Sequence, residues 1–314
     1  MESLPSTIHS SSDNMSTNAT IATDGVVKRY GETFALDNVS LEIPAGSIYG
    51  LVGPNGSGKT TLLHLLAGLV RPSAGSVQVF GEPVAGNEDE VLSRIGVVHE
   101  DFGVYEELTG REHLRYLGSG SSNGVDPADA LEIVNLGHAA DDPVGTYSGG
   151  MIKRLGLAIA LAGEPDILLL DEPFAALDMT STETVLETLR DRHSEGTTIV
   201  FSTHMFEFVE RICTHAALLG NGGVLAAGAI DDICGDAARV TVCGDVADCS
   251  WMESLQKQNG ITEVSLSTDG TATIQGTLVA CFQAAQGIDA PPEAVHLSYP
   301  SLANVATDRE GAGP

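Results

Sequence analysis

The stretch Gly53-Pro54-Asn55-Gly56-Ser57-Gly58-Lys59-Thr60 decides the fold class of this 314-residue chain. An apolar run over residues 47–52 precedes it, and a leucine stripe of helical spacing follows over residues 59–69. A strand, a glycine-rich loop and a helix in that order open a parallel α/β sheet. We therefore expect an α/β fold with this loop at the carboxyl edge of the sheet.

The same loop matches G-x-x-x-x-G-K-[ST], the pattern of a phosphate-binding loop. Its backbone N–H groups and the N-terminal end of the next helix attract phosphate oxygens. We expect Lys59 to reach the β- and γ-phosphates of ATP, and the Thr60 hydroxyl to bind Mg²⁺. An inert glycine-rich turn is the alternative, and the position between a strand and a helix argues against it. The nucleotide-binding residues expected in this loop are Gly53, Pro54, Asn55, Gly56, Ser57, Gly58, Lys59, Thr60 and Thr61.

A second motif begins with four apolar residues at 167–170 and ends in Asp171 and Glu172. An apolar strand followed by two acids places carboxylates at the sheet edge where α/β proteins bind ligands. We expect Asp171 to hold Mg²⁺, and Glu172 to orient and deprotonate the attacking water. Two acids after a strand are common, so this motif has weight only beside the phosphate-binding loop.

A third motif, Ser148-Gly149-Gly150, precedes an apolar helix predicted over residues 152–162. On its own this turn is no more than a helix cap. It lies within residues 102–163, which are mostly helical in pattern and are predicted to form an inserted lobe. Further strands are expected at residues 76–80, 95–98, 197–201, 216–219 and 223–227, with two more between residues 25 and 43.

Taken together, these motifs resemble the ABC ATPase family over residues 26–233, in the order that the family has them. In this resemblance Tyr30 stands where an aromatic ring stacks on adenine, and Ser148-Gly149-Gly150 is the signature motif. Residues 176–178 resemble the D-loop of the dimer interface, and His204 resembles the switch histidine that contacts the γ-phosphate.

The resemblance implies a P-loop NTPase of the ABC cassette type, with a parallel-sheet core, an antiparallel β subdomain and an inserted helical lobe. It implies a homodimer in which the phosphate-binding loop of one cassette and the signature motif of the other enclose each ATP. It also implies a separate membrane-spanning permease as partner. The catalytic residues would be Glu172, His204 and Lys59, and the residues around Mg²⁺ would be Thr60, Asp171 and Glu100.

The chain departs from the family pattern at three positions. Tyr147 replaces the usual Leu before the signature motif, and Met151 replaces the usual Gln after it. Glu100 takes the place of the Q-loop glutamine. A carboxylate oxygen can still face Mg²⁺ or water, but it adds a negative charge beside the phosphates.

Glu100, residues 108–114 and residues 300–302 resemble one branch of the family. These are the single-cassette ATPases of ABC-2 type transporters, mostly exporters, which carry a small C-terminal domain. Residues 146–151 and 155–158 resemble, more weakly, the ATPases associated with copper delivery to nitrous oxide reductase. Drug and cation exporters share most of these residues, so the cargo stays open.

The domain organisation follows from changes in composition. Residues 3–18 are rich in Ser, Thr and Asn. Residues 1–23 are expected to form a disordered tail, residues 24–234 the cassette, and residues 308–314 a polar tail. Residues 235–307 are predicted to form a small α+β domain, with strands at residues 239–243, 262–267, 271–275 and 294–297 and helices at residues 251–259 and 278–286. That βαββαβ order matches a ferredoxin-like split βαβ unit.

The charge balance bounds the function. The 43 Asp and Glu residues outnumber the 15 Lys and Arg residues, and the formal net charge is −28. Such a surface repels nucleic acid phosphates, so no nucleic acid partner is expected, and it suggests adaptation to high salt. No apolar run is long enough to span a bilayer, and no signal-peptide pattern is present. The expected location is the cytoplasm, peripheral to the inner face of the cell membrane.

Two other functions compete with transport. A soluble ABC ATPase that acts on nucleic acid or ribosomes would typically carry two cassettes, long coiled coils or basic arms, which this sequence lacks. A regulatory module that binds ATP without turnover would need neither Glu172 nor His204.

Overall fold

The computed structural model describes residues 19–117, 125–233, 238–242, 255–258, 261–266, 272–276, 280–281, 284 and 295–298. The chain divides into two compact units. The first holds residues up to His204 together with Gly220–Gly223, and the second holds Met205–Leu219 and everything from Val224 onward. This division does not coincide with the domain boundary predicted after residue 234, which stays a prediction.

An antiparallel sheet opens the first unit. Its strands β1 (Ala19–Tyr30), β2 (Thr33–Pro44), β4 (Ala74–Val79) and β5 (Glu82–Pro83) lie in the order β2-β1-β4-β5. Strand β1 begins inside the predicted tail of residues 1–23. Ile21 is buried and pairs with Ile43 on one side and Val79 on the other. The tail prediction is therefore wrong for residues 19–23, because this polar-looking segment carries core residues.

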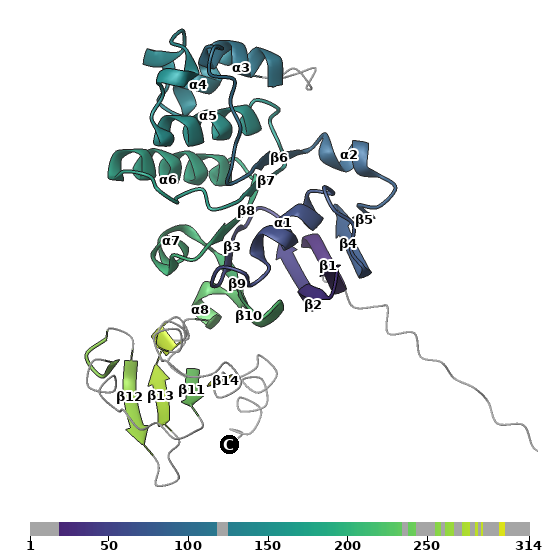
Figure 1. The fold of residues 1–314 in the computed structure, drawn as a ribbon, viewed down its shortest axis with the longest axis vertical. Helices are drawn as coiled ribbons and strands as arrows, with labels where there is room; N and C mark the ends of the chain where they lie inside the picture. Colours follow the sequence, from purple (N-terminus) through teal and green to yellow (C-terminus); the bar gives the residue numbers. More distant parts are fainter. Residues whose placement is uncertain are drawn as a thin grey trace, which may run out of the picture. The chain divides into compact units, whose positions relative to one another are not determined.

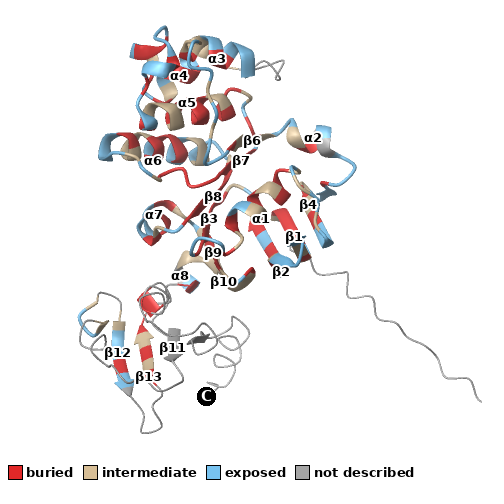
Figure 2. Cartoon of the chain, viewed as in Figure 1, coloured by how far each residue is buried: buried red, intermediate tan, exposed pale blue. Residues whose placement is uncertain are grey.

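The parallel sheet of the first unit runs in the order β3-β8-β7-β6. Its strands are β3 (Ile48–Val52), β8 (Thr198–Thr203), β7 (Ile167–Leu170) and β6 (Ile95–Val98), and each neighbouring pair is parallel. Every residue of β3, β7 and β8 is buried. Such strands are covered on both faces and therefore appear in sequence as continuous apolar runs. Figure 2 shows this core as the buried strands in the middle of the unit.

Helix α1 (Lys59–Leu66) follows the phosphate-binding loop and is shorter than the predicted range of 59–69. Its leucines at positions 62, 63, 65 and 66 are all buried, as the helical stripe predicted. Gly68 has a φ of +66°, and Leu69 beyond it is exposed. A left-handed glycine after the last turn ends the helix there. A short helix α2 (Glu88–Leu92) precedes β6.

The inserted lobe contains helices α3 (Gly110–Leu117), α4 (Pro127–Ile133) and α5 (Gly149–Leu161), with 3₁₀ turns at Gly137–Ala139 and Val144–Thr146. The three helices lie together at the top of Figure 1, and α6 (Met179–Ser194) lies beside α5. The three helices fall within residues 102–163, where the inserted lobe was predicted. Phe102 packs on α5, since a Cβ added to Gly156 would lie 3.3 Å from its ring.

The second unit begins with α7 (Phe206–Ile212), β9 (His215–Gly220), β10 (Gly223–Ala229) and α8 (Ile230–Ile233). An antiparallel sheet follows, with β11 (Ala238–Val242), β12 (Ile261–Leu266), β13 (Ala272–Gly276) and β14 (Val295–Ser298) in the order β12-β13-β11-β14. This is the strand order of a split βαβ unit. The helices predicted at residues 251–259 and 278–286 lie mostly outside the described residues, so the ferredoxin-like assignment stays a prediction.

Within the described part of the chain, no helix combines the length and the apolar character that a bilayer crossing requires.

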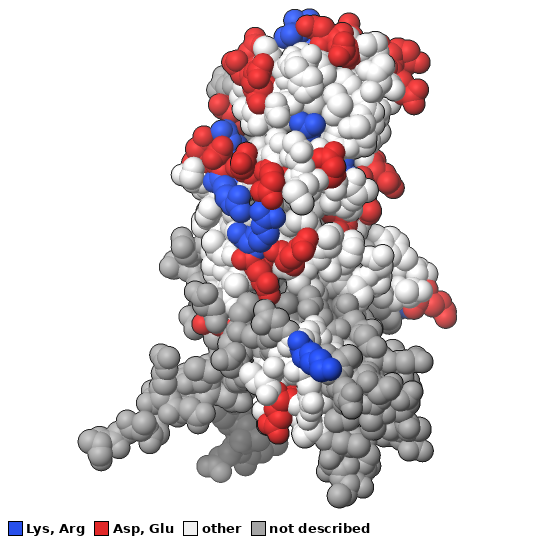
Figure 3. Space-filling view, turned by 90° about the vertical axis from the view of Figure 1, so that its left-hand side faces the viewer, with Lys and Arg blue, Asp and Glu red and all other residues white. Residues whose placement is uncertain are grey.

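On the face shown in Figure 3, acidic side chains are spread over the described part of the surface, and basic ones form a few compact groups. At a net charge of −28, self-repulsion opposes the compact state, and salt screens it over about 10 Å at 0.1 M. We expect the melting temperature to rise by about 5 °C or more between low salt and 2 M potassium chloride. Thermal unfolding across a chloride series measures this, because sulfate would also strengthen hydrophobic burial. A melting temperature that does not change with chloride would contradict the high-salt adaptation.

Candidate active site

The predicted catalytic segments meet at one edge of the parallel sheet. The phosphate-binding loop follows β3, Asp171 and Glu172 follow β7, and His204 follows β8. The Gly53 N–H donates to the Thr203 carbonyl oxygen at 3.3 Å, which ties the loop to β8. A cavity of about 460 Å³ opens here, lined by Tyr30, Thr33, Phe34, Ala35, Asn55, Gly56, Gly58, Lys59, Thr60, Thr61, Glu100, Glu172 and His204.

Two glycines give the loop its shape. Gly56 and Gly58 have φ values of +82° and +102°, a region that residues with a Cβ rarely adopt. A Cβ on Gly58 would also lie 2.6 Å from the Ala35 carbonyl oxygen and from the Leu36 side chain. The loop therefore packs against β2 with no room for a side chain, and it leads directly into the N-terminal end of α1.

Lys59 is buried at the centre of the site. Its Nζ donates to the carbonyl oxygens of Gly53, at 2.7 Å, and Pro54, at 3.1 Å, and lies 3.6 Å from Glu172 Oε1. The side chains of Lys59 and Glu172 are only 6% and 9% exposed. Two opposite charges that are this well shielded from water stabilise one another, and the ammonium group lies at the mouth of the loop.

Asp171 and Thr60 present oxygen atoms to one point. The Thr60 hydroxyl donates to Asp171 Oδ1 at 3.1 Å, and the Ser202 hydroxyl donates to the same oxygen at 2.5 Å. Ser202 Oγ also accepts the Glu172 N–H at 2.9 Å. Hydroxyl and carboxylate oxygens are the ligands that Mg²⁺ takes, so the side chains present fit this cation. Ser202 was not predicted as a site residue.

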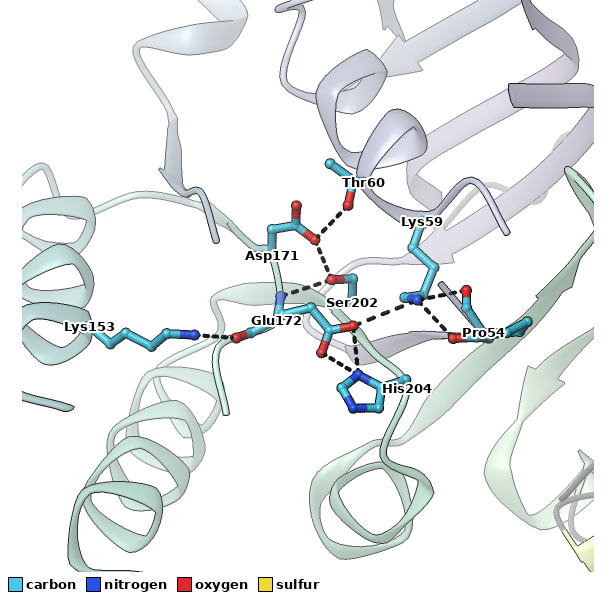
Figure 4. Close-up of polar contacts among 9 residues, drawn as sticks. Pro54, Lys59, Thr60, Lys153, Asp171, Glu172, Ser202 and His204 are labelled. Atoms are coloured by element: carbon cyan, nitrogen blue, oxygen red, sulfur yellow. Dashed lines mark hydrogen bonds and ion pairs between the residues drawn. The ribbon is translucent and has the colours of Figure 1, made fainter. Parts of the chain in front are cut away.

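Glu172 and His204 face one another (Figure 4). His204 Nδ1 lies 3.2 Å from Glu172 Oε1 and 3.1 Å from Oε2. Half of the His204 side chain is exposed, whereas Glu172 is buried. His204 thus contacts the Glu172 carboxylate on one side and solvent on the other. This position suits a residue that lies between the catalytic carboxylate and an incoming nucleotide.

A second lysine approaches Glu172 from the helical lobe. Lys153 Nζ, on α5, donates to the backbone carbonyl oxygen of Glu172 at 2.9 Å (Figure 4). Burial lowers the pKa of Lys153, and the nearby carboxylates act in the opposite direction, with Glu100 first among them. This lysine was not expected from the motifs, because its backbone contact leaves no spacing pattern.

Two half-exposed aromatic rings line the outer wall of the cavity. Tyr30, at the end of β1, was predicted, and Phe34, at the start of β2, was not. Lys28 Nζ lies 5.1 Å from the centre of the Tyr30 ring, and Arg29 Cζ lies 4.7 Å from that of Phe34. Strand pairing places Thr33 opposite Tyr30 and Phe34 opposite Arg29, so the signal that could have found Phe34 is a second aromatic residue just beyond the turn that follows Tyr30.

The signature motif lies outside this cavity. Ser148 Oγ accepts the Met151 N–H at 3.2 Å and caps α5, and Ser148 and Gly149 are exposed. The unusual Tyr147 beside them is buried and donates its hydroxyl to the Ala139 carbonyl oxygen at 2.6 Å. Gly110 leaves room for that hydroxyl, since an added Cβ would lie 2.6 Å from it. Tyr147 therefore stabilises the interior of the lobe, while Ser148 and Gly149 of the signature motif stay exposed at its surface.

Glu100 lines the cavity beyond the end of β6, and its side chain is exposed. The structure therefore brings together the predicted residues of both the phosphate-binding loop and the acidic pair, with Glu100 at the rim and the signature motif apart from them.

The sequence is similar to those of known ATP-binding proteins. The sequence model of the family described as ABC transporter matches residues 36–175. The chain is 40% identical over 209 residues to the Nod factor export ATP-binding protein I of Burkholderia orbicola, covering 65% of this chain and 69% of that protein. It is 38% identical over 218 residues to the Daunorubicin/doxorubicin resistance ATP-binding protein DrrA of Streptomyces peucetius, covering 68% and 66%.

Solved structures show the same fold. The ATP-binding subunit of an ABC transporter has a TM-score of 0.63 at 27% identity, covering 68% of this chain and 91% of that one. A dimeric ATP-binding cassette bound to ADP and Pi in a post-hydrolysis state has a TM-score of 0.61 at 28% identity, covering 67% and 98%. The chain belongs to the ABC transporter family, as an ATP-binding and ATP-hydrolysing subunit.

Proposed function

We propose that this subunit hydrolyses ATP, with Mg²⁺, to drive export through a separate membrane subunit. The observation that carries the proposal is the convergence of Lys59, Glu172 and His204 at the mouth of the phosphate-binding loop. These groups give one buried carboxylate a cation on one side and an imidazole on the other. Nod factor export and drug resistance in the named relatives favour export as the direction.

Each group has a distinct role in this proposal. The loop N–H groups and Lys59 bind the phosphates. The rings of Tyr30 and Phe34 hold the adenine base of ATP against the sheet. Thr60, Asp171 and Glu100 would hold Mg²⁺, and the cation would neutralise charge on the phosphate oxygens. Glu172 accepts a proton from the attacking water, and His204 keeps its carboxylate in place.

The signature motif completes the site in a second copy. Ser148 and Gly149 are exposed and lie outside the cavity of their own chain. Helix α5 begins at this motif, so its N-terminal dipole and free N–H groups can face the γ-phosphate bound by the partner cassette. ATP then bridges two cassettes, and hydrolysis releases them.

We place the docking surface for the membrane subunit on the lobe and define it by Tyr105, Tyr116 and Leu117. These apolar side chains are exposed, Tyr105 by 52% and Tyr116 by 64%, and the two tyrosine rings meet edge to face at 5.9 Å. Phe102 is half-buried on α5 and Leu114 is buried, so both support the lobe. An apolar surface beside the Q-loop suits a short amphipathic helix of the permease.

Charge on this surface should detach the subunit from the membrane. We expect Tyr105→Asp to lower the membrane-bound fraction at least about fivefold, because a carboxylate cannot be buried unpaired in an apolar interface. ATP affinity of the purified protein should stay within about twofold. Leu69→Asp is the matched control, since it places the same charge on another exposed apolar residue of the first unit. If Tyr105→Asp stays fully bound to the membrane and supports transport, the docking surface lies elsewhere.

The proposed location is the cytoplasmic face of the cell membrane, and the cargo is decided by the permease. Co-purification from native membranes, followed by identification of the attached membrane subunit, tests both. Reconstitution of that pair in vesicles then tests export: ATP supplied on the outside of inside-out vesicles should drive cargo inward. Recovery of the chain on ribosomes or nucleic acid, with no membrane subunit, would contradict the proposal.

A further inference from the structure

Two of the four lysines of this chain meet at one residue. The lysines are Lys28, Lys59, Lys153 and Lys257, in a chain with 43 acidic residues. Lys59 Nζ lies 3.6 Å from the Glu172 carboxylate, and Lys153 Nζ donates to the Glu172 backbone carbonyl oxygen at 2.9 Å (Figure 4). A lysine-poor chain thus places one ammonium group on the side chain and another on the backbone of its candidate base.

The backbone that Lys153 holds is unusual. Glu172 has a φ of +45°, in the left-handed region that non-glycine residues rarely adopt. Its carbonyl oxygen also accepts the Ala175 N–H at 3.2 Å, and its own N–H donates to Ser202. Such a conformation persists only where surrounding contacts hold it, and the direction of the Glu172 side chain depends on it.

Lys153 also lies beside the end of β6. It lines a small pocket of about 20 Å³ together with Val98, His99 and Asp171, and His99 directly precedes Glu100 in the chain. Burial lowers the pKa of Lys153, and the carboxylates of Glu100, Glu172, Asp171 and Asp101 oppose that lowering. A lysine has three N–H donors, and the contact with Glu172 uses one of them.

We propose that Lys153 is a positioning residue for hydrolysis, which fixes the backbone of Glu172 and supplies the counter-charge for Glu100. The proposal rests on the proposed role of Glu172 as the base. It explains how this chain carries a carboxylate where the family has an uncharged glutamine. It also links α5, which starts at the signature motif, to the turn that carries the base.

The test separates catalysis from binding. Lys153→Met keeps the length of the side chain and removes the charge and the donors. In the full-length protein we expect kcat to fall about tenfold or more, while the Kd for a fluorescent ATP analogue stays within about twofold. Lys153→Arg, which keeps charge and donors, should retain most of the turnover. Lys257→Met is the matched control, since it makes the same change of net charge at an exposed lysine of the second unit.

The second arm tests the pairing with Glu100. In a Glu100→Gln background the carboxylate that needs a counter-charge is gone. The loss of kcat caused by Lys153→Met should therefore shrink to about threefold. Equal losses in both backgrounds would overturn the link to Glu100. Unchanged turnover of Lys153→Met, or a parallel loss of ATP affinity that marks a phosphate ligand, would overturn the positioning role. Should Lys153→Met not fold, Lys153→Leu also removes the charge and the donors and carries the same expectation. Normal turnover of Glu172→Gln would overturn the proposed base and the positioning role with it, whereas a loss in Glu172→Gln beside normal turnover of Lys153→Met would overturn the positioning role alone.

Discussion

Glu172→Gln is expected to bind ATP with near-normal affinity and to lose turnover by roughly 10²–10⁴-fold. The amide has the shape of the carboxylate and can still meet Lys59 and His204, which contact Glu172 Oε1 and Oε2. It cannot accept a proton from water at neutral pH. With hydrolysis blocked, ATP should remain between two cassettes and hold them together.

Two measurements check this variant. Steady-state phosphate release gives the loss of turnover, and size-exclusion chromatography with ATP should show a dimer that the unaltered protein forms only transiently. Glu195→Gln is the control, because Glu195 pairs with Arg192 at the end of α6, outside the cavity. If Glu172→Gln hydrolyses ATP as fast as the control does, Glu172 is not the base that activates water.

Lys59→Ala is expected to weaken ATP binding by about 10–100-fold and to abolish hydrolysis. Hydrogen bonds to charged groups contribute about 1.5–3 kcal/mol each, and Lys59 presents its ammonium group where the β- and γ-phosphates bind. The substitution also leaves Glu172 buried without its nearby cation, which is 3.6 Å away in the structure. The substitution thus takes away the positive charge that balances both the phosphates and the Glu172 carboxylate, and catalysis depends on that charge.

Titration with a fluorescent nucleotide measures the loss of ATP affinity. Thermal unfolding shows whether the substitution has also destabilised the fold. Lys59→Met is the companion variant, since it keeps the buried aliphatic stem and removes only the charged end. Lys257→Ala provides the control for the change of net charge. If Lys59→Met binds and hydrolyses ATP as the control does, the loop has only a structural role.

Local patterns in the sequence were sufficient for most of the core. Strands β6 and β7 have the predicted ends, and β7 is a continuous apolar run because it is covered on both faces. The phosphate-binding loop was equally predictable, since its left-handed glycines and the following lysine are required by the conformation itself. Element ends were less predictable. Helix α1 stops at Leu66, because Gly68 turns the chain away, and β1 starts at Ala19, because Ile21 finds partners on two strands.

The family, the phosphate-binding loop and the acidic pair could be predicted from the sequence alone, since each is a short pattern whose chemistry depends on neighbouring residues. That Phe34, Lys153 and Ser202 join the same site follows only from the folded structure. Lys153 and Glu172 are 19 positions apart, and Thr60 and Asp171 are 111 apart. Such contacts are set by the order of parallel strands and by how α5 packs beside them. No local periodicity encodes that packing, so the second lysine at the base became visible only in the folded chain.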